Sequence, residues 1–215
     1  MTTIEPFCGY GLGLRQPHYR DFLNGDVPVD FVEVISENFM VDGGLPLDVL
    51  DAVRTSHEVV LHGVSLSPGS AHGLNTAYLD RLAALVDRVQ PLWVSDHLCW
   101  TRSSAHNSHD LLPLPMTAEA LDVVCANVQR TQDRLRRPIL LENPSSYMTF
   151  PEDEFAEWDF FAEVFAAPVA SSCSTSTTFS SAPTTTTSPL RAISIPCRWI
   201  VFARSTWRDT CRVKS

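Results

Sequence analysis

The sequence predicts an α/β fold in which parallel strands alternate with helices. Apolar runs of strand length recur near residues 31, 60, 93 and 140, amphipathic segments with helical spacing separate them, and polar or charged residues follow the runs. The chain has 215 residues, of which 44% are hydrophobic and 19% charged, so it is long enough for one domain with a sizeable core.

The first elements are predicted from short apolar runs and one amphipathic stretch. A first strand is expected within residues 9–15, where the GxGxG pattern lacks the surroundings of a dinucleotide site and is interpreted as close packing. The second strand is expected at residues 30–35 and the third at 58–64. Residues 45–56 have the spacing of a helix with one apolar face.

The later segments continue the alternation. A helix is expected at residues 75–89, with Asn75 or Thr76 as its cap, and a strand starts at residues 91–94. A polar loop is expected at residues 101–110. The remaining elements, in chain order, are a long helix capped by Thr117, a strand at residues 138–142, and an acidic, aromatic-rich helix at residues 151–165.

A run of right-handed β-α-β units fits two architectures. A closed (β/α)8 barrel (TIM barrel) places every strand end in one ring, and we expect about five of its strands here. An open doubly wound sheet is the competing architecture, because the first half of either has the same pattern.

Residues of metal-ligand type stand where the predicted strands end: Glu37, His62, Asp96, His97 and Glu142. A single histidine at a strand end is more often a hydrogen-bonded structural residue, and Asp96 could simply orient His97 or cap a turn. Three successive strands nevertheless end in such residues, and a buried charge needs a partner. Imidazole and carboxylate ligands suit iron, manganese or zinc. We therefore predict a metal site formed by His62, His97 and Glu142.

Composition excludes several partners. A formal net charge of -9 argues against a nucleic-acid backbone as the main partner. The sequence has neither a signal-like amino terminus nor an apolar stretch of membrane-spanning length, so we expect a cytoplasmic protein without membrane contact. Six cysteines without a CxxC pair indicate neither a zinc ribbon nor a disulfide framework.

Six motifs in series resemble a known family: GYGLGLR, VDFVEVISENFM, VVLHGVSLSPGS, WVSDHLCW, DLLPLP and ILLENPSSY. Together they resemble the domain-of-unknown-function 692 family, also called uncharacterised protein family 0276, over roughly residues 9–166. That family is related to the multinuclear iron oxygenases of methanobactin-type peptide biosynthesis.

The resemblance implies a TIM barrel that holds two or three iron ions. With a small partner protein, such an enzyme oxidises cysteine residues of a ribosomally made precursor peptide. His62, His97 and Glu142 would be metal ligands. Glu37, Asn38, Asp96 and Asn143 are candidates for residues that orient the ligands or add to them.

The resemblance stops near residue 167. Of the 21 residues at positions 168–188, 14 are Ser or Thr, a composition typical of a disordered segment. A displaced reading frame joins the last base of each codon to the first two bases of the next codon. In that frame, the codons possible for this segment permit TGCVLLLD, VNNV, YNHHFA and IHLAGH, in this order. These stretches match motifs expected of the family. We infer that residues 167–215 are an out-of-frame tail after an N-terminal barrel part at residues 1–166. The chain would then be incomplete and inactive, and we do not expect it to bind the full set of iron ions.

Two other functions fit the pattern of strand ends. A divalent-metal sugar isomerase or a phosphodiesterase-type barrel has similar His and Glu residues at its strand ends. A non-enzymatic, truncated remnant is the third possibility, because the ligands expected beyond residue 167 are missing from this frame.

Overall fold

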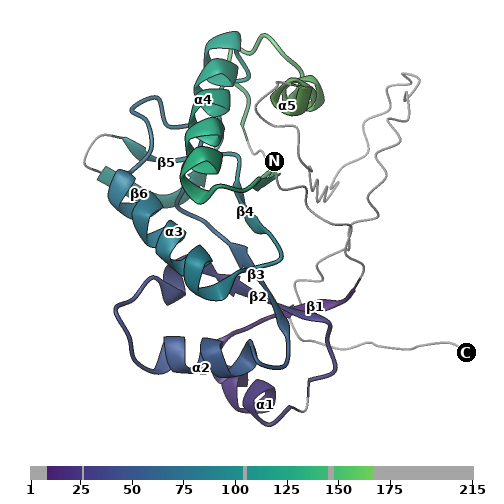
Figure 1. Cartoon of the computed structure of the whole chain (residues 1–215). Coiled ribbons are helices and arrows are strands. Elements are labelled where there is room, and N and C mark those ends of the chain that lie inside the picture. Colours follow the sequence, from purple (N-terminus) through teal and green to yellow (C-terminus); the bar gives the residue numbers. More distant parts are fainter. Residues whose placement is uncertain (1–8, 26, 104–105, 145–147, 167–215) are drawn as a thin grey trace, which may run out of the picture.

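A five-stranded parallel sheet forms the centre of the protein in the computed structural model, which describes residues 9–25, 27–103, 106–144 and 148–166 (Figure 1). The inferred out-of-frame tail lies outside the described residues. Among the helices of the described part, none is both long and apolar enough to cross a membrane.

The strands are β1 (Gly11–Gly13), β2 (Phe31–Ile35), β3 (Glu58–His62), β4 (Val94–His97) and β7 (Leu140–Glu142). They pair in the order β1-β2-β3-β4-β7, and every pair is parallel. The order follows the chain without reversal, as in a barrel, whereas a doubly wound sheet reverses direction at a switch point. The structure therefore has the strand arrangement of a partial TIM barrel rather than of the open alternative.

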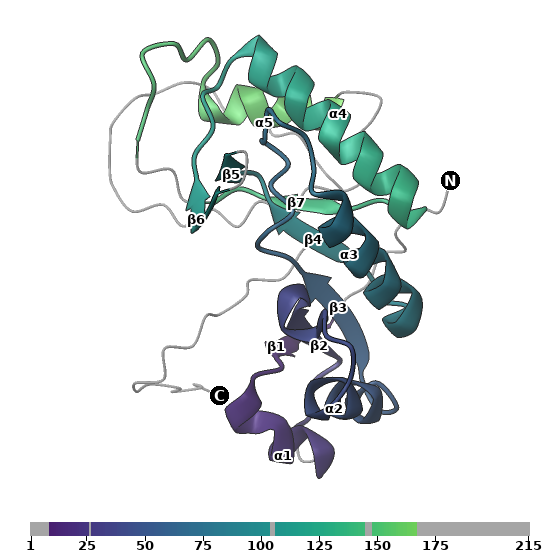
Figure 2. The ribbon, with the colours of Figure 1, turned by 90° about the vertical axis from the view of Figure 1, so that its left-hand side faces the viewer.

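Helices follow each strand of the sheet along the chain. In chain order they are η1 (Gln16–His18), α1 (Tyr19–Leu23), η2 (Ser36–Phe39), α2 (Leu45–Val53), α3 (Thr76–Val89), α4 (Ala118–Leu135) and α5 (Glu157–Ala166). Helix α3 packs against α4, and α4 packs against α5 (Figure 2). Right-handed connections between sequential neighbours place these helices on one face of the sheet.

Two predicted helix starts are confirmed by their capping bonds. The Oδ1 atom of Asn75 accepts hydrogen bonds from the backbone N–H groups of Ala77 and Tyr78, at 3.2 and 3.4 Å. The Oγ1 atom of Thr117 accepts one from Ala120 at 3.2 Å. Each cap satisfies an N–H group that has no partner inside the helix, which stabilises it by about 1 kcal/mol.

The sheet buries apolar side chains on both faces. Alternate strand residues, among them Val32, Val34 and Leu61, pack with the helix stripes in the main core. A second set lies outside that cluster and is also buried: Phe31, Val60, Trp93 and Leu140. Phe31 and Trp93 meet edge to face with ring centroids 5.3 Å apart. Residues two positions further along these strands continue the second face towards the carboxyl ends.

The segment predicted as a polar loop forms a hairpin. Strands β5 (Trp100–Ser103) and β6 (His106–Leu112) pair antiparallel, and the Nε1 atom of Trp100 donates to the carbonyl of Pro113 at 2.9 Å. Backbone pairing holds the hairpin together and does not require an apolar run. The prediction was wrong because it relied on side-chain polarity alone.

Candidate metal centre

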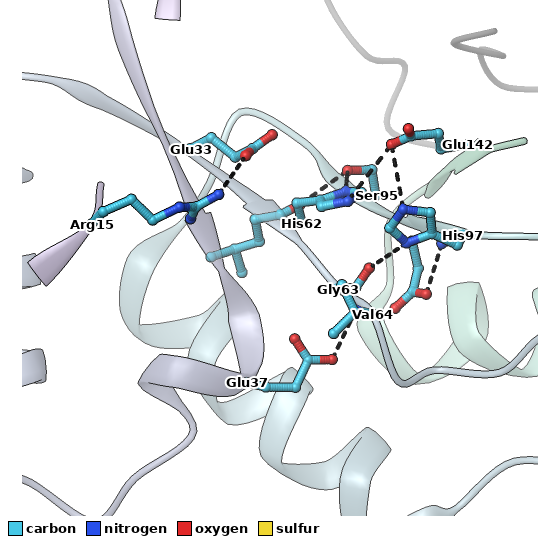
Figure 3. Close-up of polar contacts among 11 residues, drawn as sticks. Arg15, Glu33, Glu37, His62, Gly63, Val64, Ser95, His97 and Glu142 are labelled. Atoms are coloured by element: carbon cyan, nitrogen blue, oxygen red, sulfur yellow. Dashed lines mark hydrogen bonds and ion pairs between the residues drawn. The ribbon is translucent and has the colours of Figure 1, made fainter. Parts of the chain in front are cut away.

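Three neighbouring parallel strands each deliver one side chain to a common point (Figure 3). His62 ends β3, His97 ends β4 and Glu142 ends β7. His97 pairs in register with Glu142, and His62 pairs with Ser95, two residues before His97. Because side chains two residues apart share a face of the sheet, all three project from the face that carries Trp93 and Leu140.

The three side chains approach one another with their ligand atoms. The Oε2 atom of Glu142 lies 3.6 Å from Nε2 of His62 and 3.8 Å from Nε2 of His97. The two imidazoles meet edge to face, with centroids 4.6 Å apart. Both histidines are buried, at 8% and 3% exposure, whereas the Glu142 side chain is 33% exposed. The group therefore has one side open to solvent.

The other ring nitrogen of each histidine has its own partner. Nδ1 of His97 lies 3.1 Å from the Gly63 carbonyl oxygen, which can only accept, so Nδ1 carries the proton. Nδ1 of His62 lies 2.9 Å from Oγ of Ser95, and that hydroxyl donates to the Leu61 carbonyl. Ser95 therefore accepts from Nδ1 of His62. In the neutral form of each ring, Nε2 then presents a lone pair towards Glu142, and this form binds metal ions.

This donor set fits a metal ion. The ligand atoms of His62, His97 and Glu142 all lie within 4.8 Å of one another. Two ligand atoms about 2.1 Å from one cation are about 3.0 to 3.6 Å apart for bond angles between about 90 and 120°. The measured separations from Glu142 are close to this range. Two imidazoles and one carboxylate suit iron, manganese or zinc.

Asp96 lies beside the centre but on the other face of β4. Its side chain is 2% exposed and accepts from the backbone N–H of its neighbour His97 at 2.7 Å and of Leu66 at 3.3 Å. Burial, followed by the nearby charge of Glu37, raises the pKa of Asp96 well above its usual value. A Cβ on Gly63 would lie 2.1 Å from Asp96 Oδ2, so this close approach requires glycine.

Glu37 fixes the segment that follows His62. Its Oε1 atom accepts from the Val64 N–H at 2.9 Å and from the Tyr78 hydroxyl at 2.7 Å. Burial is the main cause that raises the pKa of Tyr78 well above its usual value, and the charges of Asp96 and Glu37 add to it. Glu37 thus holds the chain just beyond β3, rather than joining the three ligand-type side chains.

The two candidate asparagines have different surroundings. Asn38 is exposed in η2. The Nδ2 atom of Asn143 donates to Oε1 of Glu157 at 2.6 Å and so ties the end of β7 to α5.

Sequence reasoning missed Ser95, Gly63 and Tyr78. Ser95 stands two residues before His97 and hence on the same face of β4, which could have marked it as a neighbour of His62. The Gly63 contact and the Tyr78 contact join residues 34 and 41 positions apart, and the sequence carries no signal for either pairing.

A family model and several relatives match the chain. The family described as RiPP precursor modification enzyme MbnB/TglH/ChrH matches residues 9–170. A UPF0276 protein of Caulobacter vibrioides is 64% identical over 165 residues, covering 76% of this chain and 59% of the relative. One from Rhizorhabdus wittichii is 64% identical over 153 residues, covering 70% and 55%.

A third relative is more distant. A UPF0276 protein of an Anaeromyxobacter species is 52% identical over 164 residues, covering 76% of this chain and 58% of that relative. The chain therefore spans less than two thirds of the length of these relatives. A crystal structure of D-psicose 3-epimerase in the presence of D-fructose aligns with 8% identity and a TM-score of 0.48, over 73% of this chain and 60% of that one.

Proposed function

Because the chain belongs to the MbnB/TglH/ChrH family of RiPP precursor modification enzymes, we propose that His62, His97 and Glu142 hold iron in an enzyme that oxidises a cysteine of a ribosomally made peptide. The observation that carries the proposal is the convergence of two imidazole Nε2 atoms and one carboxylate at neighbouring strand ends. Two or three iron ions, as the family resemblance implies, would need ligands beyond this group.

Bound iron would supply redox chemistry with O2 at a substrate thiolate. The residues of this chain would orient the ligand atoms for the metal ion. Gly63 and Ser95 hold the Nδ1–H groups, so neither imidazole can rotate without losing a hydrogen bond. The carboxylate of Glu142 contributes negative charge beside the two rings, and a cation bound by the three side chains compensates that charge.

The solvent-facing side of the centre leaves room for the peptide. The Glu142 side chain is 33% exposed while both imidazoles are buried, so a substrate thiol reaches the group from the side of Glu142. A small partner protein that presents the precursor peptide, in the cytoplasm, belongs to the same proposal. Asp96 and Asn143 would keep the ends of β4 and β7 in place.

We also propose that the residues from 167 onward are an out-of-frame translation. The ordered reappearance of three motifs in one displaced frame supports it, and the family match ends at residue 170, close to the inferred change of frame. The ligands expected in the lost frame would then be absent, and the 215-residue chain would be inactive although it keeps three ligands.

Metal analysis after anaerobic purification tests the metal assignment. Redox-active iron bound to the chain supports the proposal. Stable zinc, manganese or magnesium in its place would instead favour the sugar isomerase or phosphodiesterase-type chemistry, and a chain without affinity for any of these metals would favour the non-enzymatic remnant. Restoring the frame and adding a cysteine-containing precursor peptide then tests oxidation directly, by the mass change of the peptide.

A further inference from the structure

A polar groove lies beside the start of α3, outside the group formed by His62, His97 and Glu142. It consists of two cavities of about 410 and 260 Å³, which share Asn75 and Arg102. The larger is lined by Glu37, Met40, Ser65, Asn75, Tyr78, Arg81 and Arg102. We call the two cavities together the arginine groove.

Two guanidinium groups from different elements line the larger cavity. Arg81 belongs to α3 and is exposed, and Arg102 belongs to β5 and is half-buried. Among the described residues, neither takes part in an ion pair, whereas Arg88 and Arg134 pair with Asp51 and Asp80. In a chain of net charge -9, the larger cavity therefore brings together two arginines and one acidic residue, Glu37.

The remaining polar groups of the groove are mainly hydrogen-bond donors. Asn75 uses its Oδ1 atom to cap α3, which leaves its Nδ2–H2 group available. Hydroxyl groups of Ser70 and Thr76 line the smaller cavity. The Oε1 atom of Glu37 is already engaged by Val64 and Tyr78, and its Oε2 atom is buried. A ligand in the groove therefore contacts donors and cations, with the buried Glu37 carboxylate beside them.

The groove lies near the end of the sheet that carries the metal group. Helix α3 follows β3, so its first turn is at the carboxyl end of the strand that His62 ends. Glu37 connects the two places, because it lines the groove and bonds Val64, two residues beyond His62. The metal group and the arginine groove therefore both lie at the carboxyl end of β3.

We propose that the arginine groove binds a carboxylate of the peptide substrate, an inference that rests on the proposed function. Guanidinium groups match carboxylates through paired hydrogen bonds. Met40 and Leu74 also line the groove, and such apolar walls suit a peptide side chain or backbone better than a free inorganic anion. The carboxylate comes either from an acidic side chain or from the peptide C-terminus.

Fluorescence anisotropy with labelled peptides tests the proposal on the 215-residue chain. Three probes share one length: one with Asp and Glu and an amidated end, one with Asn and Gln and an amidated end, and one with Asn and Gln and a free C-terminus. We expect the acidic or the free-ended probe to bind about tenfold more tightly than the neutral one, a difference of about 1.4 kcal/mol. Whichever charged probe binds identifies the source of the carboxylate.

Arginine variants test whether the preference for the charged probe depends on the groove or on the overall charge of the protein. Arg81→Gln combined with Arg102→Gln is expected to abolish the preference for the charged probe, and Arg102→Lys to weaken it partly. Arg20→Gln, which removes one positive charge at an exposed position of α1, is expected to keep it. Thermal unfolding of each variant confirms that it folds.

Three results would overturn the proposal: equal binding of charged and neutral probes, an equal loss with Arg20→Gln, or a groove that binds inorganic phosphate but no peptide. The iron content of the double Arg variant, measured in parallel, distinguishes a failure of the groove proposal from a failure of the metal assignment. Lost peptide preference with retained iron supports the groove, and peptide preference without any iron leaves the groove standing while the metal assignment fails.

Discussion

The Nδ1 atom of His97 lies 3.1 Å from the carbonyl oxygen of Gly63, so the end of β3 fixes the imidazole that β4 delivers (Figure 3). The same glycine leaves room for the Asp96 carboxylate, which accepts from the backbone of His97. Gly63 thus has two roles: its carbonyl group orients the His97 imidazole, and its lack of a side chain leaves room for Asp96.

Replacing Gly63 by alanine is expected to destabilise the fold by about 1 to 3 kcal/mol, because the added methyl group would overlap Asp96 Oδ2 at 2.1 Å. Urea unfolding measures the change. Gly43→Ala is the matched control, since its added Cβ meets no atom within 4 Å. Equal free energies of unfolding for the two variants would contradict this packing.

Replacing Ser95 by alanine removes the oxygen that accepts from Nδ1 of His62. We expect metal affinity to fall about 10- to 100-fold, the usual cost of losing a hydrogen-bond partner of a metal-binding histidine. Equilibrium titration with Fe²⁺ under anaerobic conditions gives the affinity. Ser36→Ala serves as the control, because the buried Ser36 hydroxyl has no hydrogen-bond partner among the described atoms. An unchanged affinity in Ser95→Ala would argue that His62 does not need this orientation.

The thiol of Cys99 is expected to resist alkylation at pH 8 in the folded protein. Burial, followed by the charges of Asp96 and Asp110, raises the pKa of Cys99 far above its usual value, so the reactive thiolate is scarce at that pH. Cys125 is half-buried, and burial also raises its pKa. Peptide mapping after iodoacetamide treatment should show Cys125 labelled before Cys99, and Cys99 only after unfolding. Faster labelling of Cys99 would contradict its burial.

The out-of-frame interpretation of the tail makes a direct prediction about the coding DNA. Read one base displaced after codon 166, it should encode LLDVNN, then NHHF, then HLAGH. Sequencing the gene from an independent sample also separates gene decay from a sequencing error. If the displaced frame lacks these motifs, the out-of-frame interpretation is wrong.

Much of the fold followed from the sequence because parallel strands leave a strong local pattern. The apolar runs that end in His62, His97 and Glu142 lie on adjacent strands, so their convergence could be predicted from strand order alone. That Asp96 faces away from His97 could also have been predicted, because successive side chains of a strand point to opposite faces of the sheet. The bond from Tyr78 to Glu37 joins a helix to a turn 41 positions earlier, and such pairings depend on packing. The β5–β6 hairpin was missed because its residues are polar.

The central claim is that His62, His97 and Glu142 bind one metal ion together. Anaerobic titration of the 215-residue chain with Fe²⁺, followed by metal analysis, tests it most directly. We expect the unaltered chain and His18→Ala, an exposed histidine elsewhere, to bind iron equally, and His62→Ala, His97→Ala and Glu142→Gln each to lose it. Iron binding that persists unchanged in the three ligand variants would contradict the account.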